Sequence, residues 1–408
     1  MLIGSHALAH IANPRVRRGQ SVGPRQRAVL DPNAFAAARD EISRWPGYEP
    51  TSLVSLSGIA HSIGIASVWY KDEAGRFGLG SFKALGGAYA VLRLIKREIK
   101  RRGIVPDVLV RELLAGRWAA ECAQITVTCA TDGNHGRSVA WGAKQFGCGC
   151  IIFLHATVSK GREDAIARYG AKIIRVSGNY DDAVRAADKM AADEGWFVVS
   201  DTSYPGYNDV PRDVMQGYTI MVDEAVRQFP SGERPTHAFL QGGVGGMAAA
   251  VADHLWEIYG ADRPRIVVVE PDKAACLFES ARAGKPTVVH GELDTLMAGL
   301  ACGEVSLLAW DILDECADDF LTVPDAAAVE CMRLLAAGTA GDVPLVAGES
   351  AVAGLAGLIL AASDLALAQV LRLRPDSRVL LIGSEGATDP EVYARLVGRK
   401  PEDVRKSA

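Results

Sequence analysis

Lys83 lies in surroundings that could make its amine a reactive group. It belongs to Arg76-Phe-Gly-Leu-Gly-Ser-Phe-Lys-Ala-Leu-Gly-Gly87, between aromatic and small residues, where a helix over 84–99 is expected to begin. Desolvation lowers the pKa of an amine and frees its lone pair, which is the condition for imine formation with a carbonyl cofactor. Taken alone, the pattern also suits a surface lysine whose stem covers apolar side chains.

A second loop, Ala130-Thr-Asp-Gly-Asn-His-Gly136, carries too many polar side chains for a simple turn. It follows an apolar run over 125–129 and precedes a helix expected to begin near Arg137. Asn134 could hydrogen-bond the edge of a planar ligand, and Asp132 could act as acid or base if burial raised its pKa. For His135, a helix-capping or packed histidine is expected rather than a catalytic one.

A third loop, Gln241-Gly-Gly-Val-Gly-Gly-Met247, joins a presumed strand to a presumed helix. Its bare backbone amides and the helix N-terminus could hold a phosphate. Gly243, Gly245 and Ala248 also satisfy a dinucleotide fingerprint, and Glu270 ends the next strand where a ribose-binding acid would stand. NAD, another phosphate ligand and a purely structural turn all remain open for this loop.

The elements around these loops favour an α/β fold. Apolar segments alternate with helical ones from Ile151 to about residue 201 and again after Thr236, which predicts parallel βαβ units in two domains. Each of the three loops leaves the carboxyl end of a presumed strand and enters a helix, and open α/β sheets bind ligands there. The sequence therefore predicts two domains, each a parallel sheet flanked by helices.

Composition limits the function further. The chain has 408 residues, enough for two domains sharing a cleft, and 49% hydrophobic and 23% charged residues, as in a packed globular protein. The formal charge of -5 and the absence of a long basic cluster argue against nucleic-acid or anionic-membrane binding. No secretory pattern or membrane-length apolar stretch is visible, so a soluble cytoplasmic protein is expected. The eight cysteines are expected to be mostly reduced, and no zinc-ligand spacing is present, so we expect no metal.

The three loops together describe what pyridoxal phosphate requires: a Schiff-base lysine, a polar loop with an asparagine and a glycine loop for the phosphate. The same motifs, in this order, resemble the tryptophan-synthase-β-like (fold type II) enzymes. Longer segments resemble the diaminopropionate ammonia-lyase family and cover most of the chain from Tyr48 to Tyr393: KDEAGRFGLGSFKALGGAYA, ATDGNHGRSVAWGA, DTSYPGY with MQGY, VEPDKAAC, MAGLACGE, GES and SEGATD.

The resemblance implies a role for each cofactor contact. Lys83 would hold pyridoxal phosphate as a Schiff base, and Asn134 would bind the ring hydroxyl. Ser384 would meet the pyridine nitrogen as a neutral partner, which suits β-elimination over transamination. The phosphate would lie in the glycine loop, on Gly242, Gly243, Val244, Gly245 and Gly246.

The resemblance also implies the substrate and the acids that act on it. Asp132 stands before GNHG where serine and threonine dehydratases carry a small neutral or hydroxyl residue, and a carboxylate there could attract the second ammonium of 2,3-diaminopropionate. Lys83 would deprotonate the L isomer and Asp132 the D isomer, with pyruvate and two ammonia as products. Asp201 matches a second acidic site residue, although a helix cap or turn former is its ordinary role. Three further residues are expected around the substrate: Ser81, Thr131 and Tyr204.

By the same resemblance, residues 1–90 and 215–408 would form the large cofactor-binding domain and residues 91–214 the small one. A homodimer is expected, and Cys276 and Cys302 match a pair that can form a disulfide in family members, although a cytoplasmic setting favours thiols. Gly80 and the stretch DTSYPGYNDVP depart from the family pattern near the substrate.

Three functional hypotheses follow. The first is the lyase. The second is a serine/threonine dehydratase, or another enzyme acting on a β-substituted amino acid, for which Asp132 is the obstacle. The third is an NAD-linked oxidoreductase or a non-catalytic ligand-binding relative, which would leave Lys83 and Asn134 unexplained.

Overall fold

The computed structural model describes residues 2–131, 133–338 and 341–407 of the chain. It comprises two compact units. Unit 1 contains residues 1–30, 50–75 and 221–408, and unit 2 contains residues 31–49 and 76–220. Asp132, which the sequence placed among the catalytic residues, lies outside the described residues.

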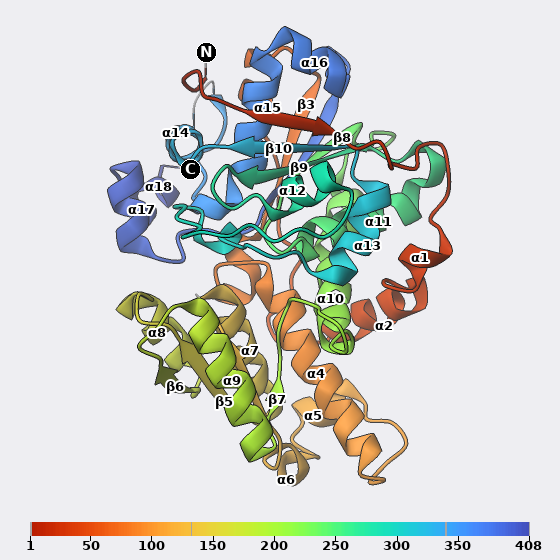
Figure 1. The fold of residues 1–408 in the computed structure, drawn as a ribbon, viewed down its shortest axis with the longest axis vertical. Helices are drawn as coiled ribbons and strands as arrows, with labels where there is room; N and C mark the ends of the chain where they lie inside the picture. The colour runs from red at the N-terminus through yellow and green to blue at the C-terminus, as the bar shows by residue number, and fades with distance from the viewer. Residues whose placement is uncertain (1, 132, 339–340, 408) are drawn as a thin grey trace. The chain divides into compact units, whose positions relative to one another are not determined.

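Within the described residues, unit 1 is built on a seven-stranded sheet of order β1-β10-β9-β8-β11-β3-β2. The inner strands from β10 to β3 pair in parallel, whereas β1 pairs with β10 and β2 pairs with β3 antiparallel. Figure 1 shows β1 as a red arrow near the N-terminus. The strands are β1 (Ala9–Ala12), β2 (Leu53–Ser55), β3 (Ser67–Asp72), β8 (His237–Gln241), β9 (Arg265–Pro271), β10 (Asp319–Val323) and β11 (Arg378–Gly383).

The successive strands β8, β9, β10 and β11 are parallel because helices lie between them along the chain and return it along the sheet. Helix α15 (Ala353–Ser363) packs on β8, β9, β10 and β11, and it is buried and apolar over most of its length. The other helices of this unit are α1 (Pro24–Arg27), α3 (Ser57–Ser62), α11 (Gly246–Tyr259), α12 (Cys276–Ala283), α13 (Leu307–Cys316), α14 (Asp325–Ala337), α16 (Leu365–Leu371), α17 (Pro390–Val397) and α18 (Pro401–Arg405). Short 3₁₀ turns cover Gly260–Asp262, Ala298–Leu300 and Glu349–Ala351.

Two of the predicted cofactor segments meet at one edge of this sheet. Strands β8 and β11 are hydrogen-bonded neighbours, with Phe239 opposite Leu381. Because the carboxyl ends of parallel strands lie on the same side, the loop after β8 and Ser384 after β11 emerge together.

Within the described residues, unit 2 contains a four-stranded sheet of order β6-β5-β4-β7, and every pairing in it is parallel. The strands are β4 (Thr126–Ala130), β5 (Gly149–Leu154), β6 (Lys172–Arg175) and β7 (Phe197–Val198). Helix α9 (Tyr180–Glu194) begins at a capping box of Asn179 and Asp182 and ends at Gly195, whose φ is positive. The other helices here are α2 (Pro32–Ile42), α4 (Lys83–Arg101), α5 (Val110–Leu114), α6 (Ala119–Cys122), α7 (Asn134–Phe146) and α8 (Lys160–Ala167). The 3₁₀ segment Glu73–Gly78 and helix α10 (Asp209–Gln228) each cross from one unit to the other along the chain.

The fold confirms the predicted α/β class and differs from the sequence prediction in detail. The sheet of unit 1 is parallel only in its inner strands, because short N-terminal segments add β1 and β2 at its edges. Residues 31–49 and 76–90 pack with unit 2, although the sequence analysis had placed them in the large domain. The predicted domain boundaries near residues 90 and 214 follow the family resemblance rather than this division, and they stay predictions.

No single helix of the described residues is long and apolar enough to cross a membrane. The pair α15 and α16 meets that test of length and composition only when the two are taken together, and they are bent by 116° at their junction.

Candidate active site

Lys83 is the first residue of α4, and its ammonium lies beside a carboxylate. Lys83 Nζ donates to Asp201 Oδ2 at 2.5 Å, with 21% and 18% of the two side chains exposed. Burial raises the pKa of Asp201, but the Lys83 ammonium and then His135 lower it more, so the net pKa is well below its usual range. Two predicted site residues are thus in direct contact, and Asp201 remains a carboxylate at any working pH.

Aromatic rings complete the surroundings of Lys83. Its Nζ lies 5.4 Å from the ring centroid of Phe82 and 5.8 Å from that of Tyr218, and the two rings are 4.6 Å apart. Such rings hold an ammonium through cation–π attraction while keeping water away from it. Tyr218 is 1% exposed, and burial raises the pKa of its hydroxyl, so it remains a neutral phenol.

His135 contacts the same pair from α7. Its Nε2 forms a 2.8 Å hydrogen bond with the carbonyl of Val199, which requires a proton on that nitrogen. Its Nδ1 lies 3.7 Å from Asp201 Oδ2, too far for a hydrogen bond. Burial lowers the pKa of His135 by more than the Asp201 carboxylate raises it, and the Lys83 ammonium lowers it further, so the ring is neutral and packed, as the sequence predicted.

Close helix packing fixes the start of α4. A Cβ added at Gly87 would lie 1.9 Å from Ser138 Oγ on α7, and one added at Gly217 would lie 2.0 Å from the carbonyl oxygen of Leu85. Both neighbouring helices therefore approach α4 at glycines, as close backbone contact requires. Lys83 consequently stands on a rigid support rather than on a loop.

The loop before α7 is held by Thr131. Its Oγ1 accepts hydrogen bonds from the backbone N–H groups of Gly133 and Gly136, both at 3.1 Å. The oxygen of Thr131 thus caps the start of the helix, and its hydroxyl proton stays available to an acceptor, so its predicted contact with the substrate stays a prediction. Asn134 is the first residue of α7 and is partly exposed.

Unit 1 carries the glycine loop and Ser384. A Cβ added at Gly242 would lie 2.8 Å from Glu270 Cγ, and Gly245 has a φ of +97° at the N-cap of α11, so neither position accepts a side chain readily. Gln241 Nε2 donates to the carbonyl of Ile382 at 2.7 Å and to Ser384 Oγ at 2.9 Å. Since Ser384 accepts that bond, its own proton is available to a further acceptor.

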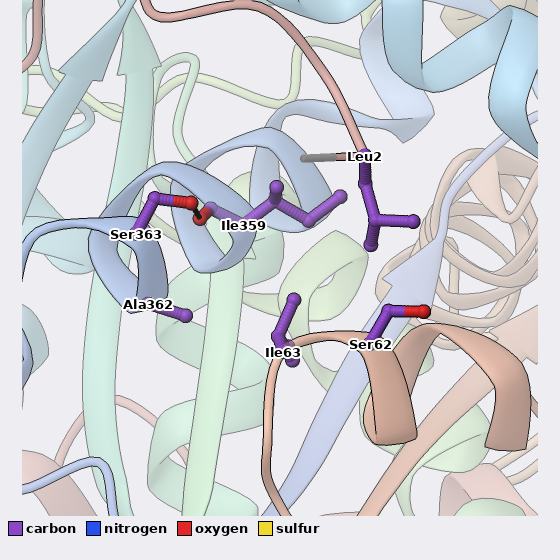
Figure 2. A pocket seen from close by; sticks show the side chains of 6 residues that line it. All are labelled: Leu2, Ser62, Ile63, Ile359, Ala362 and Ser363. Atoms are coloured by element: carbon purple, nitrogen blue, oxygen red, sulfur yellow. Dashed lines mark hydrogen bonds between the residues drawn. The ribbon is translucent and has the colours of Figure 1, made fainter.

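A separate pocket of about 320 Å³ opens in unit 1, and Figure 2 shows its lining: Leu2, Ser62, Ile63, Ile359, Ala362 and Ser363. Its two hydroxyls donate within their own helices, Ser62 to Gly58 and Ser363 to Ile359. The pocket contains none of the predicted site residues, and its polar groups are already satisfied. It offers no chemistry to the candidate site.

Comparison with known proteins identifies the family. The family model described as pyridoxal-phosphate dependent enzyme matches residues 44–385. The chain belongs to the pyridoxal-phosphate dependent enzyme family. Diaminopropionate ammonia-lyase of Escherichia coli K12 is 40% identical over 366 residues, which cover 88% of this chain and 90% of the relative.

Solved structures agree with this membership. The holo form of diaminopropionate ammonia-lyase from Escherichia coli matches at 36% identity and a TM-score of 0.88, with 97% of both chains covered. The same Escherichia coli enzyme in complex with an aminoacrylate-PLP azomethine reaction intermediate matches with a TM-score of 0.85, covering 97% of this chain and 98% of that one. The predicted fold type II architecture and the predicted cofactor are confirmed.

The residues of each unit fit pyridoxal phosphate. In unit 1 the buried Gln241 Oε1 has no hydrogen-bond partner among the described residues, and the nearby glycine loop presents backbone where side chains would not fit. In unit 2 the Lys83 amine is positioned and partly shielded from water. An amine, a bare backbone loop and a neutral hydroxyl donor are the groups this cofactor requires in its family.

The remaining predicted residues stay predictions. Ser81 is buried beside α4. Tyr204 is 44% exposed, and its ring stacks on that of Tyr207 at 4.9 Å. Cys276 and Cys302 are not joined, and the eight cysteines, all of which the structure describes, form no disulfide. Among the described residues, no group of His, Cys, Asp and Glu could hold a metal ion.

The contact of Tyr218 with the Lys83 ammonium was not predictable from the sequence. The segment MQGY was recognised only as a family resemblance, and nothing local distinguishes its tyrosine from a core residue. The contact between Tyr218 and Lys83 joins α10 to α4 across a long stretch of chain, and only the packing of the two helices reveals it.

Proposed function

We propose that this enzyme eliminates the β-amino group of 2,3-diaminopropionate and accepts both the D and L isomers. One substrate molecule and one water give one pyruvate and two ammonia. The observation that carries the proposal is the Lys83–Asp201 pair, in a chain 40% identical to a diaminopropionate ammonia-lyase over most of its length. Asp132 in the segment before GNHG supports the same substrate, because a carboxylate suits a second ammonium.

Four groups of residues would hold the cofactor. Lys83 would bind it through the amine, Asn134 would hydrogen-bond the ring hydroxyl, and backbone amides of the loop 242–246 would bind the phosphate. Ser384 would donate its free proton to the pyridine nitrogen, because Gln241 already occupies the acceptor side of that hydroxyl. When bound, pyridoxal phosphate supplies an electron sink for the negative charge that develops at Cα.

Two side chains would carry out the proton transfers, and a third would hold one of them in place. The Lys83 amine would take the Cα proton of the L isomer, and the Asp132 carboxylate would take that of the D isomer. After Lys83 has taken a proton, Asp201 would hold its ammonium in place, since the low pKa of Asp201 prevents it from taking the proton itself. Lys83 could then return the proton to the departing β-amino group.

Residues near the expected substrate position favour a second candidate function, elimination from serine, threonine or another β-substituted amino acid. Gly80 and the segment 201–211 differ from the pattern expected of the family, and Tyr204 within that segment is exposed. A serine/threonine dehydratase activity, or elimination from another β-substituted amino acid, would use the same Lys83 and the same cofactor.

One assay separates these functions. Purified, cofactor-loaded enzyme is given D- or L-2,3-diaminopropionate, and pyruvate is measured, with L-serine and L-threonine tested in parallel. We expect strong turnover of both diaminopropionate isomers. Preference for serine or threonine would favour the dehydratase, and no pyruvate from any of the four would contradict both assignments.

Asp132→Asn tests whether Asp132 is the base for the D isomer and Lys83 the base for the L isomer. It removes the carboxylate proposed for the D isomer and leaves Lys83 intact. We expect kcat to fall by roughly 10² or more for the D isomer, the range for losing a general base, and by much less for the L isomer. Equal losses on both isomers would show that Asp132 does not distinguish the two faces.

We further propose a homodimer in the cytoplasm. The dimer rests on the resemblance to the family, and the location is consistent with thiols that form no disulfide. Sedimentation of the purified protein at several concentrations measures the first directly.

A further inference from the structure

Glu270 is a buried acid that the proposed reaction does not use. It lies near the end of β9 with 0% of its surface exposed. Its sequence position suits a ribose-binding acid, but only under the NAD hypothesis. A fully buried carboxyl is costly unless its oxygens are hydrogen-bonded, so its contacts should reveal its role.

The carboxyl of Glu270 caps helix α12. It accepts hydrogen bonds from the backbone N–H groups of Leu277 at 3.0 Å and Phe278 at 2.6 Å. Both belong to the first turn of α12, and the residue before that helix, Ala275, offers no side-chain cap. Glu270 therefore satisfies two N–H groups that the helix itself leaves without partners.

The same side chain contacts the glycine loop. A Cβ added at Gly242 would lie 2.8 Å from Glu270 Cγ and 2.8 Å from Leu277 Cδ1. Cys276, at the start of α12, donates its thiol to the carbonyl of Gly243 at 3.4 Å. The first two residues of the loop thus rest on Glu270 and on the helix turn that Glu270 holds.

We propose that Glu270 is the positioning residue of the phosphate site: it ties the start of α12 to the floor of the loop 242–246 and so fixes that loop for a phosphate monoester. The proposal rests on the assignment of this loop to the cofactor phosphate. Burial raises the pKa of Glu270 to about 8, although the bonds from Leu277 and Phe278 oppose the shift. At neutral pH the carboxyl is uncharged, so it supports the loop without repelling the phosphate.

Glu270→Gln tests this role without changing the charge at neutral pH. The amide nitrogen cannot accept a hydrogen bond, so Leu277 or Phe278 loses its acceptor. Apoenzyme is titrated with pyridoxal phosphate and with pyridoxal, which lacks the phosphate, and the Kd of each is measured by absorbance at about pH 7. We expect the Kd for pyridoxal phosphate to rise roughly tenfold and the Kd for pyridoxal to change little.

Asp342→Asn is the matched control. Asp342 is also buried and accepts backbone bonds at the start of a helix, from Gly58 at 2.7 Å and Ile59 at 2.9 Å, but its helix is α3. It should leave both Kd values unchanged even if it lowers the melting temperature. Equal losses of affinity for the two ligands in Glu270→Gln, or no loss, would overturn the positioning role.

A loop variant separates the failure of this role from the failure of the site assignment. In Gly243→Ala, a Cβ would lie 3.1 Å from the carbonyl oxygen of Gly299, so we expect a small shift of the loop or of its neighbour. If Gly243→Ala weakens pyridoxal phosphate selectively and Glu270→Gln does not, the loop binds phosphate and the role of Glu270 is wrong. If neither variant is selective, the loop assignment itself is wrong. If Glu270→Gln does not fold, Glu270→Asp, whose carboxyl is one methylene shorter, replaces it. The same comparison applies: the change in Kd for pyridoxal phosphate against the change in Kd for pyridoxal.

Discussion

At the scale of single residues, the contact between Lys83 and Asp201 predicts that the negative charge of Asp201 is needed for full activity. Asp201→Asn keeps the size and one acceptor oxygen but removes the negative charge that holds the ammonium at 2.5 Å. We expect kcat for diaminopropionate to fall tenfold to a hundredfold, since a hydrogen bond to a charged group contributes roughly 1.5–3 kcal/mol. The absorbance of the bound cofactor should persist, because Lys83 itself remains.

The pH dependence of the same variant gives an independent check. Lys83 and His135 hold the pKa of Asp201 below its usual range, so this carboxyl is ionised throughout the accessible pH range. An acidic limb in the wild-type pH profile must therefore arise from another group, and its midpoint should be unchanged in Asp201→Asn. Disappearance of the limb in the variant would show that Asp201 titrates during turnover.

Individual residues were predictable from sequence where the signal was local. Lys83 became a candidate through its aromatic and small neighbours, and the loop 242–246 through its glycines between a strand and a helix, although only their combination with the Asn134 loop indicated the cofactor. The pairing of Lys83 with Asp201 was not visible, because it depends on where the chain after β7 lies relative to the start of α4. Asp201 on its own has the sequence signature of an ordinary turn residue.

At the scale of elements, the placement of Lys83 depends on how closely α10 approaches α4. Gly217→Ala would put a Cβ 2.0 Å from the carbonyl oxygen of Leu85, a backbone atom that can move only with its helix. We expect the free energy of unfolding to fall by about 1–3 kcal/mol, the usual cost of overpacking. We also expect kcat to fall, because Lys83 shifts with its helix. Urea denaturation and the diaminopropionate assay measure the two effects.

Gly161→Ala is the control for that substitution. Gly161 lies in α8, and an added Cβ there would meet only Ser159 Oγ at 4.0 Å. Replacing a helical glycine without a clash should stabilise the protein by about 0.5–1 kcal/mol and leave kcat unchanged. If both variants behaved alike, the close approach of α10 and α4 would not matter for Lys83.

Helices and inner strands were the most predictable elements, since their periodicity repeats over many residues. The helix expected over 84–99 is observed as Lys83–Arg101, and the strand expected over 125–129 as Thr126–Ala130. The antiparallel edges β1 and β2 were missed because each is only a few residues long and partly exposed, so neither alternation nor a buried run marks it.

At the scale of the whole molecule, the pH dependence of stability should carry the contribution of a buried histidine. His254 lies in α11, and burial lowers its pKa to about 4 even though Asp223 and Glu257 raise it, with Arg227 lowering it further. The folded protein therefore binds fewer protons at this site than the unfolded chain between about pH 6.5 and 4, and its stability is lost as the pH falls through that range. At about 1.4 kcal/mol per pKa unit, this contribution approaches roughly 3 kcal/mol at the acid end.

His254→Gln should remove that part of the acid sensitivity. The free energy of unfolding of the variant, measured by urea denaturation at several pH values, should fall less steeply than that of the wild type between about pH 6.5 and 4. The absolute stability at neutral pH can drop through lost packing, so the comparison uses the slope alone. His290→Gln, at an exposed histidine, should keep the wild-type slope. A slope in His254→Gln as steep as in the wild type would mean that other groups govern acid unfolding. Asp253 and Glu270 cannot be those groups, because burial raises their pKa and their protonation on acidification is therefore stabilising.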